Sequence, residues 1–160
     1  MKKISLIPLC LILALIALSS CAKAPENTTE SKKRIDIRAL AAAVIENVKF
    51  TETPEPLESE VVKEQFSVEN INCDAVAYVQ SSAVSEIFAA FSAQNEADAQ
   101  LIENAVYDRI DYLRDGYSSY GPAEVPKIDS AVVIRDGTAV IFCISADNAE
   151  AKTFIENYIK

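Results

Sequence analysis

Apolar residues recur at a helical period just after residue 35. They fall three and four positions apart along one stripe: Ile37, Leu40, Ala41, Val44, Ile45 and Val48. Asp36 precedes this stripe, and an aspartate side chain can cap the first N–H groups of a helix. The pattern predicts an amphipathic helix over residues 36–49. The run TETPEP at 51–56 should end it, and a shorter helix is expected over 58–65.

Two pairs of β-rich segments follow, and each pair leads into another helical pattern. The first pair covers 75–80 and 85–91, and the second covers 131–135 and 138–144. Asp136-Gly137 between the second pair is typical of a two-residue hairpin turn. A long helix is expected from Asn95 onward, and a closing helix over 149–159. The buried stripe of the long helix should contain Ile102, Val106, Ile110, Leu113 and Tyr117.

The two halves resemble each other. Residues 91–106 align without gaps on 144–159, and both share Ser-Ala-x-Asn and Ile-Glu-Asn. We expect duplicated ββα units at about 74–117 and 128–160, although strands followed by Ala/Glu-rich helices can also look alike by chance. The predicted fold class is α+β, with a four-stranded antiparallel sheet and helices on one face. The N-terminal amphipathic helix would join that layer or protect a sheet edge.

The N-terminus has the pattern of an export signal. Lys2 and Lys3 precede an apolar run, Ile4 to Leu18, that is short for a membrane-spanning helix. Leu18-Ser19-Ser20-Cys21 resembles a bacterial lipobox. This predicts a lipoprotein signal peptide over 1–20, cleaved between Ser20 and Cys21. An ordinary secretory signal with a coincidental cysteine is the alternative.

Lipidation of Cys21 would place the protein on the extracytoplasmic face of the cell membrane. A diacylglyceryl group brings two acyl chains, and two chains anchor a protein stably where one does not. Residues 21–34 are polar and lack apolar periodicity, so they are expected to form a flexible tether. Residues 35–160 should then form a single domain.

Charge and composition restrict the chemistry of the domain. The formal net charge is −9, and it becomes about −11 once Lys2 and Lys3 leave with the signal. Such an acidic chain is not expected to bind nucleic acid. There is no histidine and there are only three glycines. Histidine-based catalysis and glycine-rich phosphate loops are therefore not expected, and we predict no enzyme, no cofactor and no metal site.

Two cysteines remain in the domain. Cys73 and Cys143 both fall in or beside predicted strands. Outside the cytoplasm a disulfide between them is permitted. The other interpretation is that each is a buried core thiol, which is common for cysteine.

The segment from Gly116 to Pro126 should end the long helix and link the two halves. Its tyrosines and prolines give the one candidate interaction surface that the sequence offers: Tyr117, Tyr120, Pro122 and Pro126. Tyrosine favours interfaces because it combines an apolar ring with a polar hydroxyl. Packing of this segment onto the sheet is the alternative.

The domain resembles a family of small bacterial lipoproteins, common among Clostridia-like organisms, that carry a domain of unknown function. The resemblance rests on the Asp36-led helix, on AVAYVQSS before a strand and a long helix, and on YGPAEVPKIDSAVVIRDG. It implies export and lipidation. It implies no activity, so no functional residues are carried over.

Together these features favour a membrane-anchored, non-catalytic interaction module whose partner is an envelope protein or an extracytoplasmic peptide. One alternative is a small-ligand-binding lipoprotein, although such proteins commonly use a cleft between two lobes. The other is a hydrolase that uses paired carboxylates, such as a glycosidase. No pair of carboxylates stands out in the sequence.

Overall fold

The structure, a computed structural model, describes residues 34–160. The predicted signal peptide, Cys21 and all of the tether except Arg34 lie outside them. The helices are α1 Ile37–Asn47, α2 Ser59–Gln65, α3 Glu96–Tyr120, α4 Val125–Asp129 and α5 Asn148–Tyr158, with a short 3₁₀ turn at Pro122–Glu124. The strands are β1 Glu55–Leu57, β2 Cys73–Val79, β3 Ile87–Ala93, β4 Val132–Asp136 and β5 Ala139–Ile144. No helix within this part of the chain is long and apolar enough to cross a membrane.

The five strands form one antiparallel sheet in the order β1-β2-β3-β5-β4. The sheet has five strands rather than the predicted four, because β1 was missed inside the segment that ends α1. Pro54 and Pro56 argued against a strand there. An edge strand tolerates proline, since one side of it needs no ladder hydrogen bonds, and Pro56 pairs with Tyr78 of β2.

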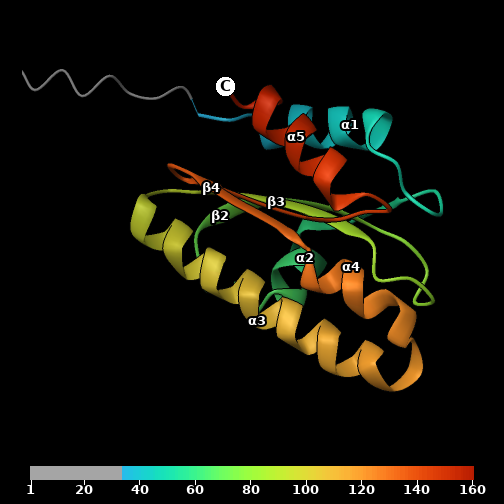
Figure 1. Cartoon of the computed structure of the whole chain (residues 1–160). Coiled ribbons are helices and arrows are strands. Elements are labelled where there is room, and N and C mark those ends of the chain that lie inside the picture. The colour runs from blue at the N-terminus through green and yellow to red at the C-terminus, as the bar shows by residue number, and fades with distance from the viewer. Residues whose placement is uncertain (1–33) are drawn as a thin grey trace, which may run out of the picture. The chain divides into compact units, whose positions relative to one another are not determined.

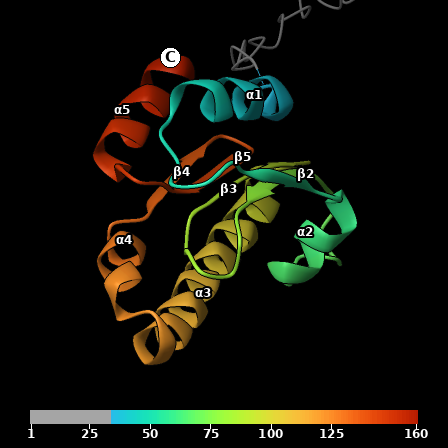
Figure 2. The ribbon, with the colours of Figure 1, turned by 90° about the vertical axis from the view of Figure 1, so that its right-hand side faces the viewer.

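Helices cover both faces of the sheet, so the prediction of a single helical layer is wrong. Figures 1 and 2 show α2, α3 and α4 on one side and α1 with α5 on the other. β3 and β5 are buried along their whole length. Their side chains are apolar at every position except Ser92, and no face of these central strands is left for water.

The core accordingly consists of two separate apolar clusters. The cluster beneath α3 includes Phe66, Phe91 and Phe142, whose rings pack edge to face. The cluster beneath α1 includes Leu40 and Val44 from the predicted amphipathic stripe. The stripe prediction for α1 is confirmed, and Asp36 caps the helix by accepting hydrogen bonds from the N–H groups of Arg38 and Ala39, both at 3.0 Å.

The predicted duplication of ββα units is not matched by the structure. Phe91 and Ile144, which the repeat aligns, both belong to the cluster beneath α3, and β3 and β5 are antiparallel neighbours. Ile102 of α3 and its counterpart Ile155 of α5 lie in opposite clusters. The two ββα units are therefore not superposable copies.

The aligned asparagines show where the two halves diverge. Asn95 is the N-cap of α3 and accepts a hydrogen bond from the Asp98 N–H at 2.9 Å. Asn148 lies one residue inside α5, where Asp147 is the cap instead. The buried Asn148 side chain accepts from the Ser145 N–H at 2.7 Å. A shift of one residue turns a helix by about 100° relative to its strand, so identical motifs present different faces.

Candidate functional site

The long helix α3 organises one end of the domain. Its buried residues include Ile102, Val106, Ile110 and Tyr117, as the sequence predicts, and Leu113 packs against the same cluster. Gly116 was expected to help end the helix, but α3 continues to Tyr120. One glycine inside a helix costs only about 1 kcal/mol, and tertiary packing offsets that cost here.

Tyr117 joins α3 to the loop between β2 and β3, residues 80–86. Its hydroxyl donates to the backbone carbonyl of Val84 at 2.6 Å and lies 3.2 Å from that of Ser82. Burial raises the pKa of Tyr117 to about 12, and the neighbouring Tyr120 adds to the increase. These contacts therefore hold the Tyr117 side chain between α3 and the loop, and it does not project freely from the surface. Figure 2 shows this loop reaching down from the sheet beside α3.

A polar network holds the same loop from its other side. The Glu86 side chain is fully buried, and its carboxylate accepts from the Lys127 Nζ at 2.8 Å and the Gln80 Nε2 at 3.1 Å. It also accepts from the backbone N–H of Thr51 at 2.6 Å and from its hydroxyl at 2.5 Å. We call this group, with Glu124, the Glu86 network.

Glu124 completes this network. It accepts from the Ser85 N–H at 2.9 Å and lies 3.2 Å from the Lys127 Nζ. Burial alone would raise the pKa of both carboxyls, but the hydrogen bonds and the lysine charge outweigh it and lower the pKa of Glu86 and of Glu124. Burial would likewise lower the pKa of Lys127, but its two carboxylate partners raise it. The three groups stay charged at neutral pH and stabilise one another.

Arg109 lacks such partners. It lies on α3 with its guanidinium carbon 5.0 Å from the centroid of the Tyr112 ring, within the range of a cation–π contact. Its Nε is the one buried side-chain nitrogen or oxygen without a hydrogen-bond partner in the part of the chain that the structure describes. The side chain makes no ion pair with another described residue. Burial lowers the pKa of Arg109, and Tyr112, Tyr117 and Tyr120 partly offset this.

A pocket of about 290 Å³ lies between this arginine and the β2–β3 loop. Arg109, Tyr112, Tyr117 and Tyr120 line it from α3, and residues 79–82 and 84–87 line it from the sheet side. The Tyr112 and Tyr120 side chains are 68% and 65% exposed, so their rings stand at the rim. We call this the Arg109 pocket. A second hollow of about 340 Å³ shares Gln65, Arg109 and Tyr112 with it.

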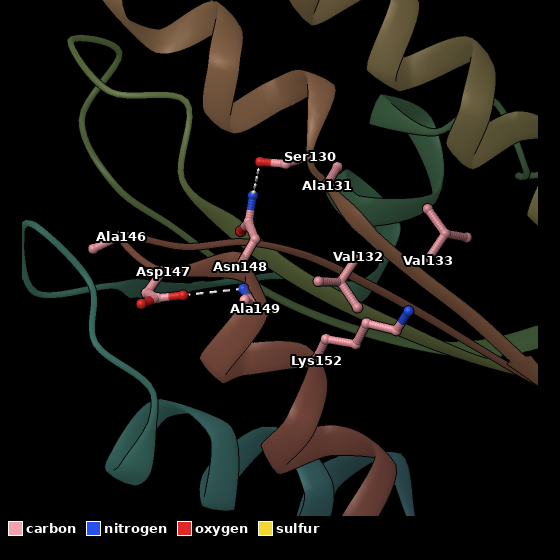
Figure 3. A pocket seen from close by; sticks show the side chains of 9 residues that line it. All are labelled: Ser130, Ala131, Val132, Val133, Ala146, Asp147, Asn148, Ala149 and Lys152. Carbon is pink, nitrogen blue, oxygen red and sulfur yellow. Dashed lines mark hydrogen bonds between the residues drawn. The ribbon is translucent and has the colours of Figure 1, made fainter.

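The pocket drawn in Figure 3 differs in its polar chemistry. It has a volume of about 540 Å³ and lies between the start of β4 and the start of α5. Its polar groups already have partners. Asn148 Nδ2 donates to Ser130 at 3.0 Å, and the Asp147 carboxylate accepts from the Ala149 N–H at 3.1 Å. The Arg109 pocket is therefore the stronger candidate for a binding site.

Only two of the four predicted interaction residues line the Arg109 pocket. Tyr120 and Tyr117 both line the Arg109 pocket, one at its rim and one buried in its wall. Pro122 and Pro126 are exposed but do not line it. They belong to the turn and to α4, which deliver Glu124 and Lys127 to the Glu86 network.

Of the two interpretations of the cysteines, the structure contradicts the disulfide. Cys73 and Cys143 are free, buried thiols. They lie in the two different clusters on opposite faces of the sheet, with β3 between their strands. Burial raises the pKa of both thiols, that of Cys143 to about 12.

Sequence reasoning missed Arg109, which looked like a member of a charged helix face. One signal could have found it. Arg109, Tyr112 and Tyr120 are spaced three and eight residues apart and fall on one face of a helix, beside the predicted apolar stripe. Within residues 34–160 no group of three or more Cys, Asp or Glu side chains is placed to hold a metal ion.

The fold and this site define a small α+β domain with a five-stranded antiparallel sheet between two helical layers. Residues 46–145 match the family described as Domain of unknown function (DUF4358), and the chain belongs to that family. The match contains the Arg109 pocket and the Glu86 network, and it ends before α5. No curated protein and no solved structure matches the chain.

Proposed function

We propose that this protein is a non-catalytic binding module, lipidated at Cys21 and held on the extracytoplasmic face of the cell membrane. The Arg109 pocket is its binding surface, and an envelope protein or an extracytoplasmic peptide is its partner. The observation that carries the proposal is a half-buried arginine that has no hydrogen-bond or ion-pair partner among residues 34–160 and is framed by two exposed tyrosine rings. Tyrosine and arginine are the residues most enriched where proteins bind one another.

The Glu86 network supports a binding role over the hydrolase alternative. Glu86 and Glu124 are the pair of carboxylates to consider for such a hydrolase, because both contact Lys127. Their lowered pKa values keep both ionised at neutral pH. A hydrolase with two carboxylates needs one of them protonated as an acid. This network instead fixes the loop that forms one wall of the pocket.

In-cell photocrosslinking tests the binding surface. A photoreactive phenylalanine analogue would replace Tyr112 or Tyr120 in the full-length protein, and Tyr158 would serve as the matched control. Tyr158 is also exposed, at 45%, but it lies on α5 on the opposite face of the sheet. We expect the same adduct from the first two positions and none from the third. Equal labelling at all three positions, or at none, would remove the proposed surface.

Membrane fractionation tests the anchor separately. Cys21→Ala should leave the precursor uncleaved or release the protein from membranes, since an acylated cysteine supplies the two chains that stable anchoring requires. A variant that is still cleaved and remains with the membrane fraction would contradict the anchor.

A second candidate function is small-ligand binding, and the pocket volume of about 290 Å³ favours it. Pockets for drug-sized ligands begin at about 300 Å³, so a small metabolite would fill this one. A thermal-shift screen of small acids against the purified protein, with a response lost in Arg109→Gln, would promote this candidate.

A further inference from the structure

We infer that the Arg109 pocket binds a carboxylate group that is attached to an apolar body. The inference rests on the proposed function and names the chemistry of its ligand. The carboxylate has two sources, the C-terminus of a peptide or a free small acid, and the test below separates them.

The charge of Arg109 is poorly compensated. A guanidinium group has five N–H donors and remains charged under all ordinary conditions. Here none of them donates to another described residue, and Nε is shielded from water without a partner. Two other arginines of the domain form ion pairs: Arg114 with Asp111 and Asp129, and Arg135 with Glu103 at 2.8 Å. A bound anion would supply Arg109 with a counter-charge and with acceptors for its N–H groups.

The surroundings favour a carboxylate over a dianionic phosphate. Glu86 lines the same pocket, and Glu124 lies close enough to raise the pKa of Tyr117. Lys127 neutralises only one of these two carboxylates. With a chain charge of −9 besides, each additional negative charge on a ligand increases the repulsion. A carboxylate carries one charge, and its two oxygens match the fork of the guanidinium.

The walls of the pocket indicate what the carboxylate is attached to. Apolar surface comes from β2, the β2–β3 loop, β3 and α3, through Val79, Val84, Ile87 and Leu113, and the rings of Tyr112 and Tyr120 stand at the rim. Tyr120 is braced by Tyr117, with ring centroids 4.8 Å apart. An apolar side chain next to the carboxylate would bury itself against these walls.

Two matched pairs of probes test the inference on the full-length protein purified in detergent. The small pair is N-acetyl-leucine and N-acetyl-leucinamide. The peptide pair is one short peptide ending in leucine, made with a free C-terminal acid and as the amide. Binding to each protein would be followed by the backbone amide resonances of the 80–86 loop in ¹⁵N-labelled protein, which remain in every variant. In the unchanged protein the Arg109 Nε–Hε resonance, assigned by its loss in Arg109→Lys, would report on the guanidinium itself. We expect the acid of at least one pair to bind about tenfold or more tightly than its amide, because a charge-assisted hydrogen bond is lost.

Three variants identify the group responsible. Arg109→Gln should lose the preference for acid over amide. Arg109→Lys keeps the positive charge but not the two parallel N–H donors of the guanidinium. This variant should therefore retain only part of the preference for acid over amide. Arg114→Gln makes the same change in charge on the same helix, at an exposed arginine outside the pocket. It should bind within about twofold of the unchanged protein.

The outcomes are distinct. Preference for the acid in the peptide pair supports a C-terminal carboxylate, and preference in the small pair alone supports a free acid. Acid and amide binding equally would overturn the carboxylate while leaving the interaction surface intact, provided that the Tyr112 and Tyr120 crosslinks persist. Acid binding that survives in Arg109→Gln, or no binding of any probe, would also overturn the inference. Loss of those crosslinks as well would remove the proposed function with it.

Discussion

The Glu86–Lys127 pair offers the sharpest test of how the pocket wall is held. The Glu86 side chain has no exposed surface, and four hydrogen bonds reach its carboxylate. Lys127→Met would leave this carboxylate buried without its counter-ion. Removing one partner of a buried ion pair costs about 3–5 kcal/mol. Glu86→Gln should cost less, about 1–3 kcal/mol, because the amide keeps an acceptor and Lys127 is partly exposed.

The double variant should be less damaging than the two single costs added together, because neither charge is then left unpaired. We expect a coupling energy of at least about 1 kcal/mol in this double-mutant cycle. Urea denaturation followed by circular dichroism measures all four proteins. Lys152→Met is the matched control, since Lys152 is exposed and lies 3.9 Å from Glu156. That change should alter stability by less than about 0.5 kcal/mol.

The same pair predicts a pH dependence. The pKa of Glu86 is lowered in the folded protein, so its contribution is present above the unfolded-state pKa of about 4.3 and is lost as the pH falls below it. Glu86→Gln should therefore lose less stability than the unchanged protein between about pH 5 and pH 3. A coupling energy near zero, or parallel pH profiles for the two proteins, would refute the role assigned to this pair.

Three further predictions concern the core and the end of α3. Ile102→Ala and Ile155→Ala should each lower the free energy of unfolding by about 2–5 kcal/mol. Because the two side chains lie in opposite clusters, the two losses should add within about 0.5 kcal/mol in urea denaturation. Strong coupling between them would place both side chains in one cluster. Gly121→Ala should destabilise by about 1–3 kcal/mol, since its new Cβ would lie 2.9 Å from the Tyr117 ring. Gly116→Ala meets no contact closer than 3.6 Å and should stabilise by about 0.5–1 kcal/mol; melting curves that rank these two glycine variants the other way would contradict the packing at this helix end. The thiols of β2 and β5 should react with a thiol reagent only after unfolding, because both are buried and have a raised pKa; rapid labelling of the native protein would show that the sheet opens.

Much of the secondary structure was predictable because it depends on local patterns. The stripe of Leu40 and Val44 gave α1, and Asp136-Gly137 marks the turn between β4 and β5, where Gly137 adopts a φ of +59°. β1 was not predictable in this way, because three residues with a central proline carry no strand pattern of their own. They form a strand only because Val79, Tyr78 and Ala77 of β2 present an edge to them.

The sequence did not predict which helices cover which face of the sheet, for a different reason. β3 and β5 are buried at every position and carry one polar residue, Ser92, so neither strand has a polar side to mark which face is covered. The repeated motif added to the error, because Ser-Ala-x-Asn and Ile-Glu-Asn recur in two segments whose helices lie on opposite faces of the sheet. The caps of the two helices, Asn95 and Asp147, also differ by one aligned position, so the shared motif presents different faces of its helix in the two halves.

The candidate site was only half predictable, and the missing half is the informative one. Tyr117 and Tyr120 stood out by residue type alone, whereas Arg109 lies among Asp108 and Asp111 in a charged pattern that is typical of a solvated helix face. In the structure its neighbour Arg114 takes Asp111. Arg109 lies half-buried over the Tyr112 ring and forms no ion pair with a described residue, so its desolvation is only partly offset and should weaken the fold. Arg109→Gln should then leave the unliganded protein as stable as before or more so, the reverse of what a structural arginine would give. Functional sites commonly carry such a cost. Thermal melting of the ligand-free variant measures it, and a clear loss of stability would mean that Arg109 serves the fold rather than a ligand.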